Sequence, residues 1–386
     1  MSESEMRAVR RSFVLDAAIA VLGAAGAILS FLAEEPHWTA IRYYTLDSNL
    51  LLLAACSVQA VFEAGILAGK RLFVPSWARL FKYVAVCLTS VTFLVVLLIL
   101  MPMLGGLRVF PQAFLMHSAL FHHFLCPVLG FASYVFADRA GFPDKRVTWL
   151  ALAPTLLYAV VTTAMNYARL LHGPYPFLYV YEQPLWMTVL WFLLIPGFAW
   201  VLAWAVWKLA LRRSKPRAAE PDALPEAKAW TEDGFLKDQD ALSGYTYRTI
   251  PANNNSCGPV AAFDLRRFAG DAPDFSEVLA EMDGLHLLRI PGPTLMYVMR
   301  RYFTKYLPGW HEARGRDAAV AAAEGSRMGV FRYHEQKIPH FVAYFRSGQG
   351  CRFFNVCADE EDVTMSIRDF AERHMRGGSV RLIYWN

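Results

Sequence analysis

The stretch WMTVLWFLLIPGFAWVLAWAVWKLAL at 186–211, followed at once by RRSKPR at 212–217, decides how this chain is organised. The first part exceeds the run of about 20 apolar residues that crosses a hydrocarbon core about 30 Å thick. The second part is basic and contains a proline, which is typical of a segment on the aqueous side of a membrane. The chain therefore changes from membrane to soluble sequence near residue 212.

Five more apolar runs of similar length precede this one. They lie at 12–33, 48–69, 80–104, 113–137 and 147–171. We therefore expect an all-α bundle of six transmembrane helices over 1–212, with the first span retained rather than cleaved as a signal peptide. The composition agrees, because 55% of the 386 residues are hydrophobic and 18% are charged. That balance excludes a disordered chain and a small disulfide-bonded scaffold.

The basic residues predict how the bundle is oriented. They gather before span 1, between spans 2 and 3, between spans 4 and 5, and after span 6. Their members are Arg7, Arg10, Arg11, Lys70, Arg71, Arg79, Lys82, Arg139, Lys145, Arg146, Arg212, Arg213, Lys215 and Arg217. The positive-inside rule then places both termini in the cytoplasm. The net charge of +5 thus marks topology beside a lipid bilayer, and we expect no nucleic-acid partner.

Polar motifs occur within the outer half of the predicted bundle. Tyr-Tyr-Thr-x-x-Ser-Asn-Leu-Leu occupies 43–51, His-x-x-x-Pro occupies 123–127, and Tyr-Pro-Phe occupies 175–177. Such side chains either form hydrogen bonds between helices or build a site. In this order they resemble the six-span family related to the androgen-induced membrane proteins. That resemblance implies hydrolysis of a lipid ester, with Thr45 as nucleophile and His123 as its base. It leaves open whether this half is an enzyme or an anchor.

The composition shifts after the sixth span. We predict a cytoplasmic linker over 213–244, rich in proline and charge, and a soluble α+β domain over 245–386. Its expected helices lie near 257–269, 275–283, 292–305, 316–324 and 366–375, and its expected strands near 328–333, 340–346, 351–357 and 379–385.

Chemistry-bearing residues of the soluble domain fall at element boundaries. Cys257, in NNNSCGP at 253–259, begins a predicted helix, and helix N-termini favour the thiolate form of cysteine. His340 opens a predicted strand, and Asn355 lies on the strand that returns beside it. We therefore expect Asn355 to orient the imidazole of His340 toward Cys257.

This set resembles the papain-like cysteine peptidases of the bacteriocin-leader-processing type. The resemblance implies a papain-like fold, with Cys257 as nucleophile, His340 as base and Asn355 as orienting residue. The family usually carries an oxyanion-binding Gln six positions before the cysteine, where this chain has Pro251. The amide of Asn253 or Asn254 is a candidate replacement. We expect an integral membrane protein of the bacterial inner (plasma) membrane.

Three functions remain open from the sequence. The first is a membrane-tethered cysteine hydrolase, most simply a peptidase acting on a peptide or protein substrate. The second is a lipid-ester hydrolase within the bundle that uses Thr45 and His123, with a regulatory soluble domain. The third is a non-catalytic sensor whose degenerate peptidase fold binds a partner peptide. Cys351 and Cys357 are interpreted as packing residues and His334 as a reserve base. We expect no cofactor and no metal.

Overall fold

The computed structural model describes residues 3–69, 74–138, 141–142, 144–213, 230–237, 239–242, 244–248, 250–287, 292–335, 338–348, 350–356, 363–376 and 379–386. The chain divides into two compact units, Met1–Pro216 and Arg217–Asn386. Each is described by itself below, as the bundle and the C-terminal unit.

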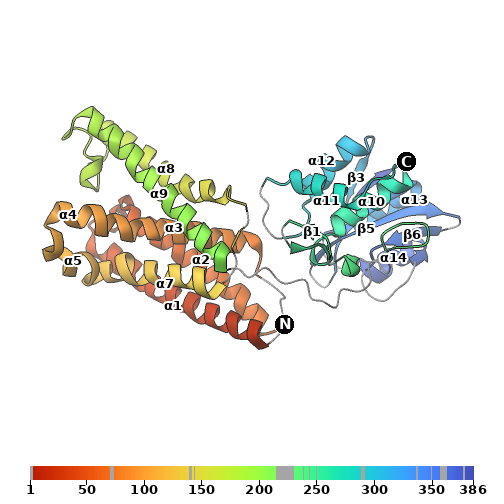
Figure 1. Cartoon of the computed structure of the whole chain (residues 1–386), viewed down its shortest axis with the longest axis horizontal. Coiled ribbons are helices and arrows are strands. Elements are labelled where there is room, and N and C mark those ends of the chain that lie inside the picture. Colours follow the sequence, from red (N-terminus) through yellow and green to blue (C-terminus); the bar gives the residue numbers. More distant parts are fainter. Residues whose placement is uncertain are drawn as a thin grey trace. The chain divides into compact units, whose positions relative to one another are not determined.

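The bundle contains six helices long and apolar enough to cross a membrane, which confirms that prediction (Figure 1). Single helices form four spans, and two spans are built from consecutive helical segments. The single helices are α1 (Glu3–Ala33), α2 (Tyr44–Leu67), α8 (Val147–Tyr167) and α9 (Leu185–Arg213). The third span joins α3 (Ser76–Val95), η2 (Val96–Leu100) and α4 (Met101–Leu104). The fourth joins α6 (His117–Ala119), η4 (Leu120–Leu125), α7 (Cys126–Ala132) and η5 (Ser133–Asp138).

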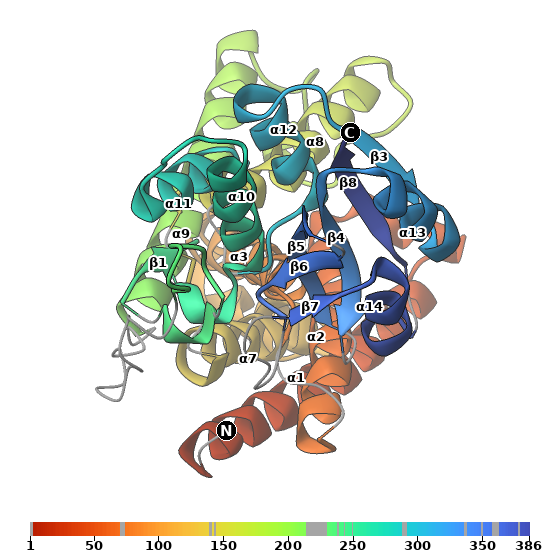
Figure 2. The same cartoon turned by 90° about the vertical axis from the view of Figure 1, so that its right-hand side faces the viewer.

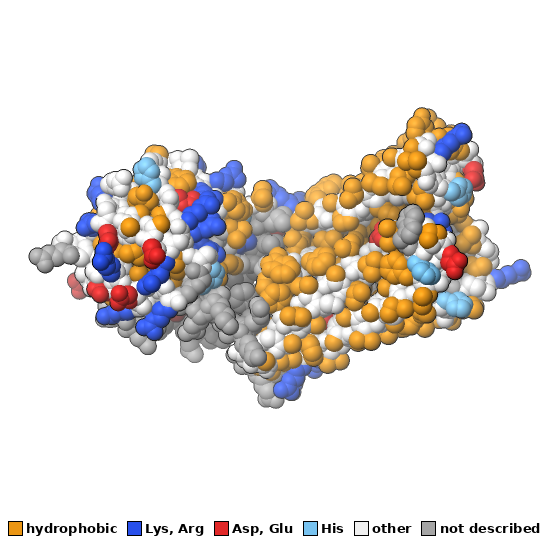
Figure 3. Space-filling model, turned by 180° about the vertical axis from the view of Figure 1, so that it is seen from behind, with side chains coloured by type: hydrophobic (Ala, Val, Ile, Leu, Met, Phe, Trp, Pro, Cys, Tyr) orange, Lys and Arg blue, Asp and Glu red, His pale blue; other side chains and the backbone are white. Residues whose placement is uncertain are grey.

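Helix α3 is the central element of the bundle, since it packs against α2, α7, α8 and α9. The segments η4 and η5 are π-helical turns. Pro127 lies two residues after the end of η4, and its missing N–H and its ring both disturb the preceding helical hydrogen bonds. Figure 3 shows hydrophobic side chains over much of the visible face of the bundle. A lipid environment explains a surface of this kind.

Two of the charges assigned to the loop between spans 2 and 3, Arg79 and Lys82, lie inside α3. Lys82 is 0% exposed. It pairs with Asp16 of α1 and Asp138 of η5, at N–O distances of 2.7 and 2.8 Å. Assigning Lys82 to a loop was therefore wrong. From the sequence alone, a lysine near the end of a span cannot be assigned to the loop or to the helix.

The C-terminal unit is built on a six-stranded antiparallel sheet of order β3-β8-β4-β5-β6-β7. The strands are β3 (His311–Arg314), β4 (Met328–Glu335), β5 (Ile338–Ser347), β6 (Gly350–Phe354), β7 (Val363–Met365) and β8 (Arg381–Trp385). The four expected strands are present as β4, β5, β6 and β8. The short edge strands β3 and β7, with three or four residues each, have too few positions for a period-two pattern.

Helices cover both faces of this sheet, as Figure 2 shows. On one face lie α10 (Cys257–Phe268), α11 (Phe275–Gly284) and α12 (Met296–Tyr306), whose side chains share a core with Phe341 and Ala343. On the other lie α13 (Arg316–Gly325) and α14 (Ile367–His374), which share a core with Val342 and Tyr344. A short hairpin, β1 (Thr246–Tyr247) and β2 (Ile250–Pro251), precedes α10.

The first core also takes in residues from the stretch that the sequence assigns to the linker. Leu236 and Leu242 are fully buried within it, and Trp230 packs against it. The packing of the C-terminal unit thus begins well before residue 245.

Candidate active site

Cys257 is the first residue of α10, as the sequence predicts. Pro259 fits the first turn because its missing N–H would have no helical partner there. Gly258 is required by space, since a Cβ at this position would meet the Thr294 side chain at 2.5 to 2.7 Å. Cys257 is only 5% exposed and joins the core between α10 and the sheet. The Cys-Gly-Pro motif therefore fixes the thiol at the N-terminus of a helix that packs against β5.

His340 lies near the start of β5 and is also buried. Its Nε2 atom is 2.6 Å from the backbone carbonyl oxygen of Asn355, just beyond the end of β6. A carbonyl only accepts hydrogen bonds, so Nε2 must carry the hydrogen. In the neutral ring Nδ1 is then the nitrogen that can take up a proton. This is the tautomer that a base acting through Nδ1 requires.

Asn355 meets His340 through its backbone rather than its side chain. Its φ of 59° lies in the left-handed region, where asparagine is favoured over most residues. The side-chain amide faces Gln239 instead: Oδ1 accepts from the Gln239 backbone N–H at 3.1 Å, and Nδ2 donates to Gln239 Oε1 at 3.1 Å. The expectation that the Asn355 amide orients the imidazole thus differs from the geometry, in which the carbonyl makes that contact.

Gln239 was not anticipated from the sequence. It belongs to the 3₁₀ turn Gln239–Ala241, which packs against the turn Ala252–Asn254 just before Cys257. The sequence assigns this residue to the linker, and only the folded chain brings it beside Asn355. A glutamine far upstream of a cysteine has no local pattern that would identify it.

The two sides of β5 separate Cys257 from His340. Side chains alternate along a strand, and His340 pairs in register with Tyr333, whose ring it meets edge-on at 6.0 Å. Tyr333 belongs to the core under α13 and α14, whereas Cys257 belongs to the core under α10. Among the residues that the structure describes, no hydrogen bond joins Cys257 to His340. Of the predicted triad, His340 and Asn355 are in contact, whereas Cys257 lies in the core on the other face of β5.

Arg332 and Tyr247 are close enough to Cys257 to interact with it electrostatically. Arg332 of β4 pairs in register with Phe341 and so faces α10. Burial, together with repulsion from Arg381, lowers the pKa of Arg332. The Tyr247 hydroxyl lies 2.9 Å from His286 Nε2 and 3.1 Å from Thr294 Oγ1. A polar network and one cation therefore border the thiol.

The candidate oxyanion donors lie at the surface side of this region. Asn254 is exposed and Asn253 half-buried, and Asn254 Nδ2 donates to Asn253 Oδ1 at 2.7 Å. Asn255 is the buried member of the run, and its amide donates to the carbonyls of Tyr247 and Gly292. Cys351 is buried on β6, as its packing interpretation requires, whereas Cys357 lies outside the described residues.

The residues predicted for the bundle are placed separately from one another. Thr45 Oγ1 is 3.3 Å from the Tyr175 hydroxyl, which also accepts from the Thr45 backbone N–H at 3.2 Å. His123 Nδ1 instead donates to the Ala113 carbonyl at 2.6 Å, and the described residues show no hydrogen bond between Thr45 and His123. The motif at 43–51 reaches the histidines through Asn49, whose Nδ2 donates to the His122 carbonyl at 3.1 Å.

Thr45 borders a cavity in the bundle. The cavity contains about 730 Å³ of space not filled by protein atoms, part of it open to the outside. Its lining is mainly apolar but includes several hydroxyl groups, and His123 is not part of it. The hydroxyl-bearing members are Tyr44, Thr45, Thr92, Thr155, Tyr158, Thr163, Tyr175 and Thr188.

Comparison of the chain with protein-family models, with curated proteins and with solved structures finds no match. The interpretation of both sites therefore depends on their residues and geometry.

Proposed function

We propose that the C-terminal unit is a cysteine hydrolase, with Cys257 as nucleophile and His340 as general base, held at a membrane by the bundle. One observation carries this proposal. Helix α10, which begins with Cys257, packs across β5, and the Nε2–H of His340 on that strand is held by the Asn355 carbonyl at 2.6 Å. A helix-terminal thiol and a histidine with a fixed tautomer are the two parts that thiol catalysis needs.

The reaction follows the usual course of acyl transfer to a thiol. Cys257 Sγ attacks the substrate carbonyl carbon while its proton passes to His340 Nδ1. That proton then goes to the leaving amine as the carbon–nitrogen bond breaks. Water, activated by the same histidine, hydrolyses the thioester and restores the thiol. An amine in place of water would give transfer instead. In the described geometry His340 points to the α13 and α14 face of β5 and Cys257 lies on the α10 face, so the step requires the start of β5 to rearrange when substrate binds.

Electrostatics near the thiol favour the same chemistry. The N-terminus of α10 carries partial positive charge, and Arg332 adds a full one on the face of the sheet where Cys257 lies. Both stabilise negative charge on a tetrahedral intermediate. Gln239 holds the Asn355 amide, which supports the loop that fixes His340.

The finer parts of the proposal have separate support. A central helix that starts with cysteine and lies on an antiparallel sheet is compatible with a papain-like fold, and this favours peptide or isopeptide bonds as substrates. The basic residues near the span ends favour a cytoplasmic location for the unit.

Labelling with a thiol-directed activity probe tests the assignment in the full-length protein in detergent micelles. We expect the wild type to be labelled at Cys257, Cys257→Ser to lose labelling, and Cys351→Ser, which alters another buried cysteine, to keep it. His340→Gln should slow labelling about 100-fold or more, because it removes the base. Labelling of Cys257 no faster than of Cys351, or no effect of His340→Gln, would refute the proposal.

A second function is favoured by the cavity beside Thr45. Its mainly apolar lining with several hydroxyl groups suits an acyl chain that carries a polar or ester group. If the bundle hydrolyses such an ester, Thr45 must be activated by a base, and His123 would first have to leave the Ala113 carbonyl. An assay with a fluorogenic lipid ester tests this: Thr45→Ala should abolish hydrolysis, whereas Thr188→Ala on the same cavity should not. Equal activity in Thr45→Ala would leave the cavity as a binding site only.

A further inference from the structure

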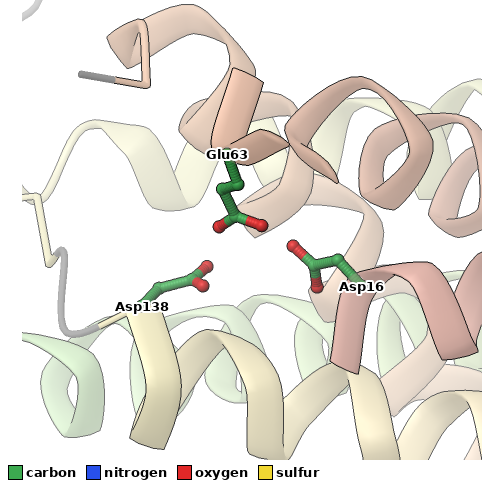
Figure 4. A group of neighbouring side chains, drawn as sticks. All are labelled: Asp16, Glu63 and Asp138. Atoms are coloured by element: carbon green, nitrogen blue, oxygen red, sulfur yellow. The ribbon is translucent and has the colours of Figure 1, made fainter. Parts of the chain in front are cut away.

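Three carboxyl groups meet inside the bundle around a buried lysine. Asp16 of α1, Glu63 of α2 and Asp138 of η5 bring their oxygens within 4.8 Å of one another (Figure 4). The Lys82 ammonium contacts both aspartates, at 2.7 and 2.8 Å, and also donates to Ser133 Oγ at 2.8 Å. We call these residues the carboxyl cluster.

Ser12 links two members of the carboxyl cluster. Its Oγ lies 2.5 Å from Glu63 Oε1 and 2.5 Å from Asp138 Oδ1. A hydroxyl carries one hydrogen, so Ser12 can donate to only one of these oxygens. If both carboxyl groups were ionised, the second contact would bring two acceptors together without a hydrogen. The arrangement is satisfied when one carboxyl group carries a proton.

Two orphaned oxygens point to the same conclusion independently. Glu63 Oε2 and Gln59 Oε1 have no hydrogen-bond partner in the described chain, although the two residues are only 3% and 2% exposed. Gln59 is aimed into the carboxyl cluster, because its Nε2 donates to Glu63 Oε1 at 3.1 Å. Both orphans are acceptors, so what they lack is a donor. Orphaned acceptors in a membrane interior are costly, and most costly on an ionised carboxylate, so the surroundings of Glu63 favour its protonated form.

The charges around the carboxyl cluster also leave room for one proton. Three carboxylates face the ammonium of Lys82 and, within electrostatic range, the guanidinium of Arg79 on the same helix. One bound proton balances the remaining negative charge. Cys56 of α2 and Tyr134 of η5 are the other titratable neighbours. From α9, Arg213 faces the ring of Phe136 rather than the carboxyl groups.

We propose that the bundle contains a proton-binding site in which Glu63 and Asp138 share one exchangeable proton through Ser12. A metal ion fits less well, because the Lys82 ammonium already occupies the position between two of the carboxylates. Release of the proton leaves uncompensated charge among α1, α2 and η5, so the packing of these helices responds to pH. The site is independent of the thiol chemistry of the C-terminal unit.

Infrared spectroscopy of the full-length protein in lipid nanodiscs tests this proposal. A protonated carboxyl group has a C=O stretching band distinct from that of a carboxylate. We expect this band near neutral pH, its loss under alkaline conditions, and its absence in Glu63→Gln, which mimics the protonated acid and should fold. Asp47→Asn, a change at the other end of α2, should keep the band. Ser12→Ala should shift its frequency, because a short hydrogen bond is lost.

Other results would overturn the proposal. One is a wild type without the band near neutral pH, and another is a band that Glu63→Gln leaves intact. Saturable binding of Na⁺ or Mg²⁺ that Glu63→Gln abolishes, without the band, would identify a metal site instead. If Glu63→Gln fails to fold, Asp138→Asn gives the same reading from the other partner.

Discussion

The bundle and the C-terminal unit place their charged side chains in opposite ways. The bundle buries Asp16 and Lys82 completely and pairs them with each other. The C-terminal unit keeps pairs such as Arg352 with Asp233 partly in solvent, with side chains 16% and 50% exposed. In lipid the outer surface is the less favourable place for a charged side chain, so charged residues lie in the interior of the bundle and pair with one another. In water the surface solvates charge at little cost.

Buried polar groups of the C-terminal unit follow a different rule from those of the bundle. Tyr247, His286 and Thr294 form a hydrogen-bonded network of uncharged groups. Asp264 is 0% exposed and accepts the Leu236 N–H at 2.8 Å, and burial raises its pKa well above the usual value. These polar groups thus differ from the buried pair of Asp16 and Lys82, in which two charged side chains compensate each other.

The largest test of this contrast is Lys82→Met. Removing one partner leaves Asp16 and Asp138 as buried, unpaired carboxylates, and we expect a loss of about 3–5 kcal/mol in the free energy of unfolding. Thermal unfolding in detergent micelles measures it. Lys208→Met, at a residue that lies over the Trp204 ring, is the matched control and should cost much less. Adding Asp16→Asn to Lys82→Met should recover part of the loss. Equal losses of stability in Lys82→Met and Lys208→Met would contradict the pairing.

A second test concerns pH and His286. Burial, with a smaller effect from Arg248, lowers the pKa of His286 to about 3, whereas a histidine in an unfolded chain has a pKa of about 6.5. Between these values the unfolded chain binds more protons, so the C-terminal unit loses stability as the pH falls, by up to about 1.4 kcal/mol per pH unit. Above about pH 6.5 this contribution is constant.

Hydrogen exchange of the amides of α10 in the full chain reports this loss. His286→Gln should flatten the dependence on pH in that range, while His311→Gln, at an exposed residue of β3, should leave it unchanged. An unaltered slope in His286→Gln would show that another group takes up the proton.

The smallest expected effect is that of Arg352→Met. Its pair with Asp233 is partly solvated, and methionine keeps much of the packing on Phe235 and Phe354. We expect a loss of no more than about 1 kcal/mol, diminishing further at high salt. Thermal unfolding in the same micelles allows direct comparison with Lys82→Met. Similar losses of unfolding free energy in Arg352→Met and Lys82→Met would contradict the proposed difference between the ion pairs of the two units.

The sequence predicted what depends on neighbouring residues. Six spans and the helix that begins at Cys257 were found because runs of apolar residues and Cys-Gly-Pro are local patterns. The carboxyl cluster was missed because its contacts join residues far apart in the chain, 66 positions between Lys82 and Asp16 and 126 between Ser12 and Asp138. The partner of a single charged residue in a span cannot be identified from the sequence around it.

The active-site prediction was likewise limited to contacts between residues that are close in the sequence. The sequence brought His340 and Asn355 together through the β5–β6 hairpin, which is a local connection. It could not tell that the Asn355 carbonyl, rather than the amide, would face the imidazole, since that follows from the φ of 59° and from Gln239. The face of β5 that His340 takes is likewise set by register with Tyr333.

The buried pair of Asp16 and Lys82 constrains how the protein is made. Synthesis delivers α1 to the membrane with an unpaired carboxylate, two spans before Lys82 arrives and three before Asp138. The first helix therefore gains its full stability in the bilayer only after the fourth has been inserted. A chain that stops after α2 therefore keeps the Asp16 carboxylate without its partner.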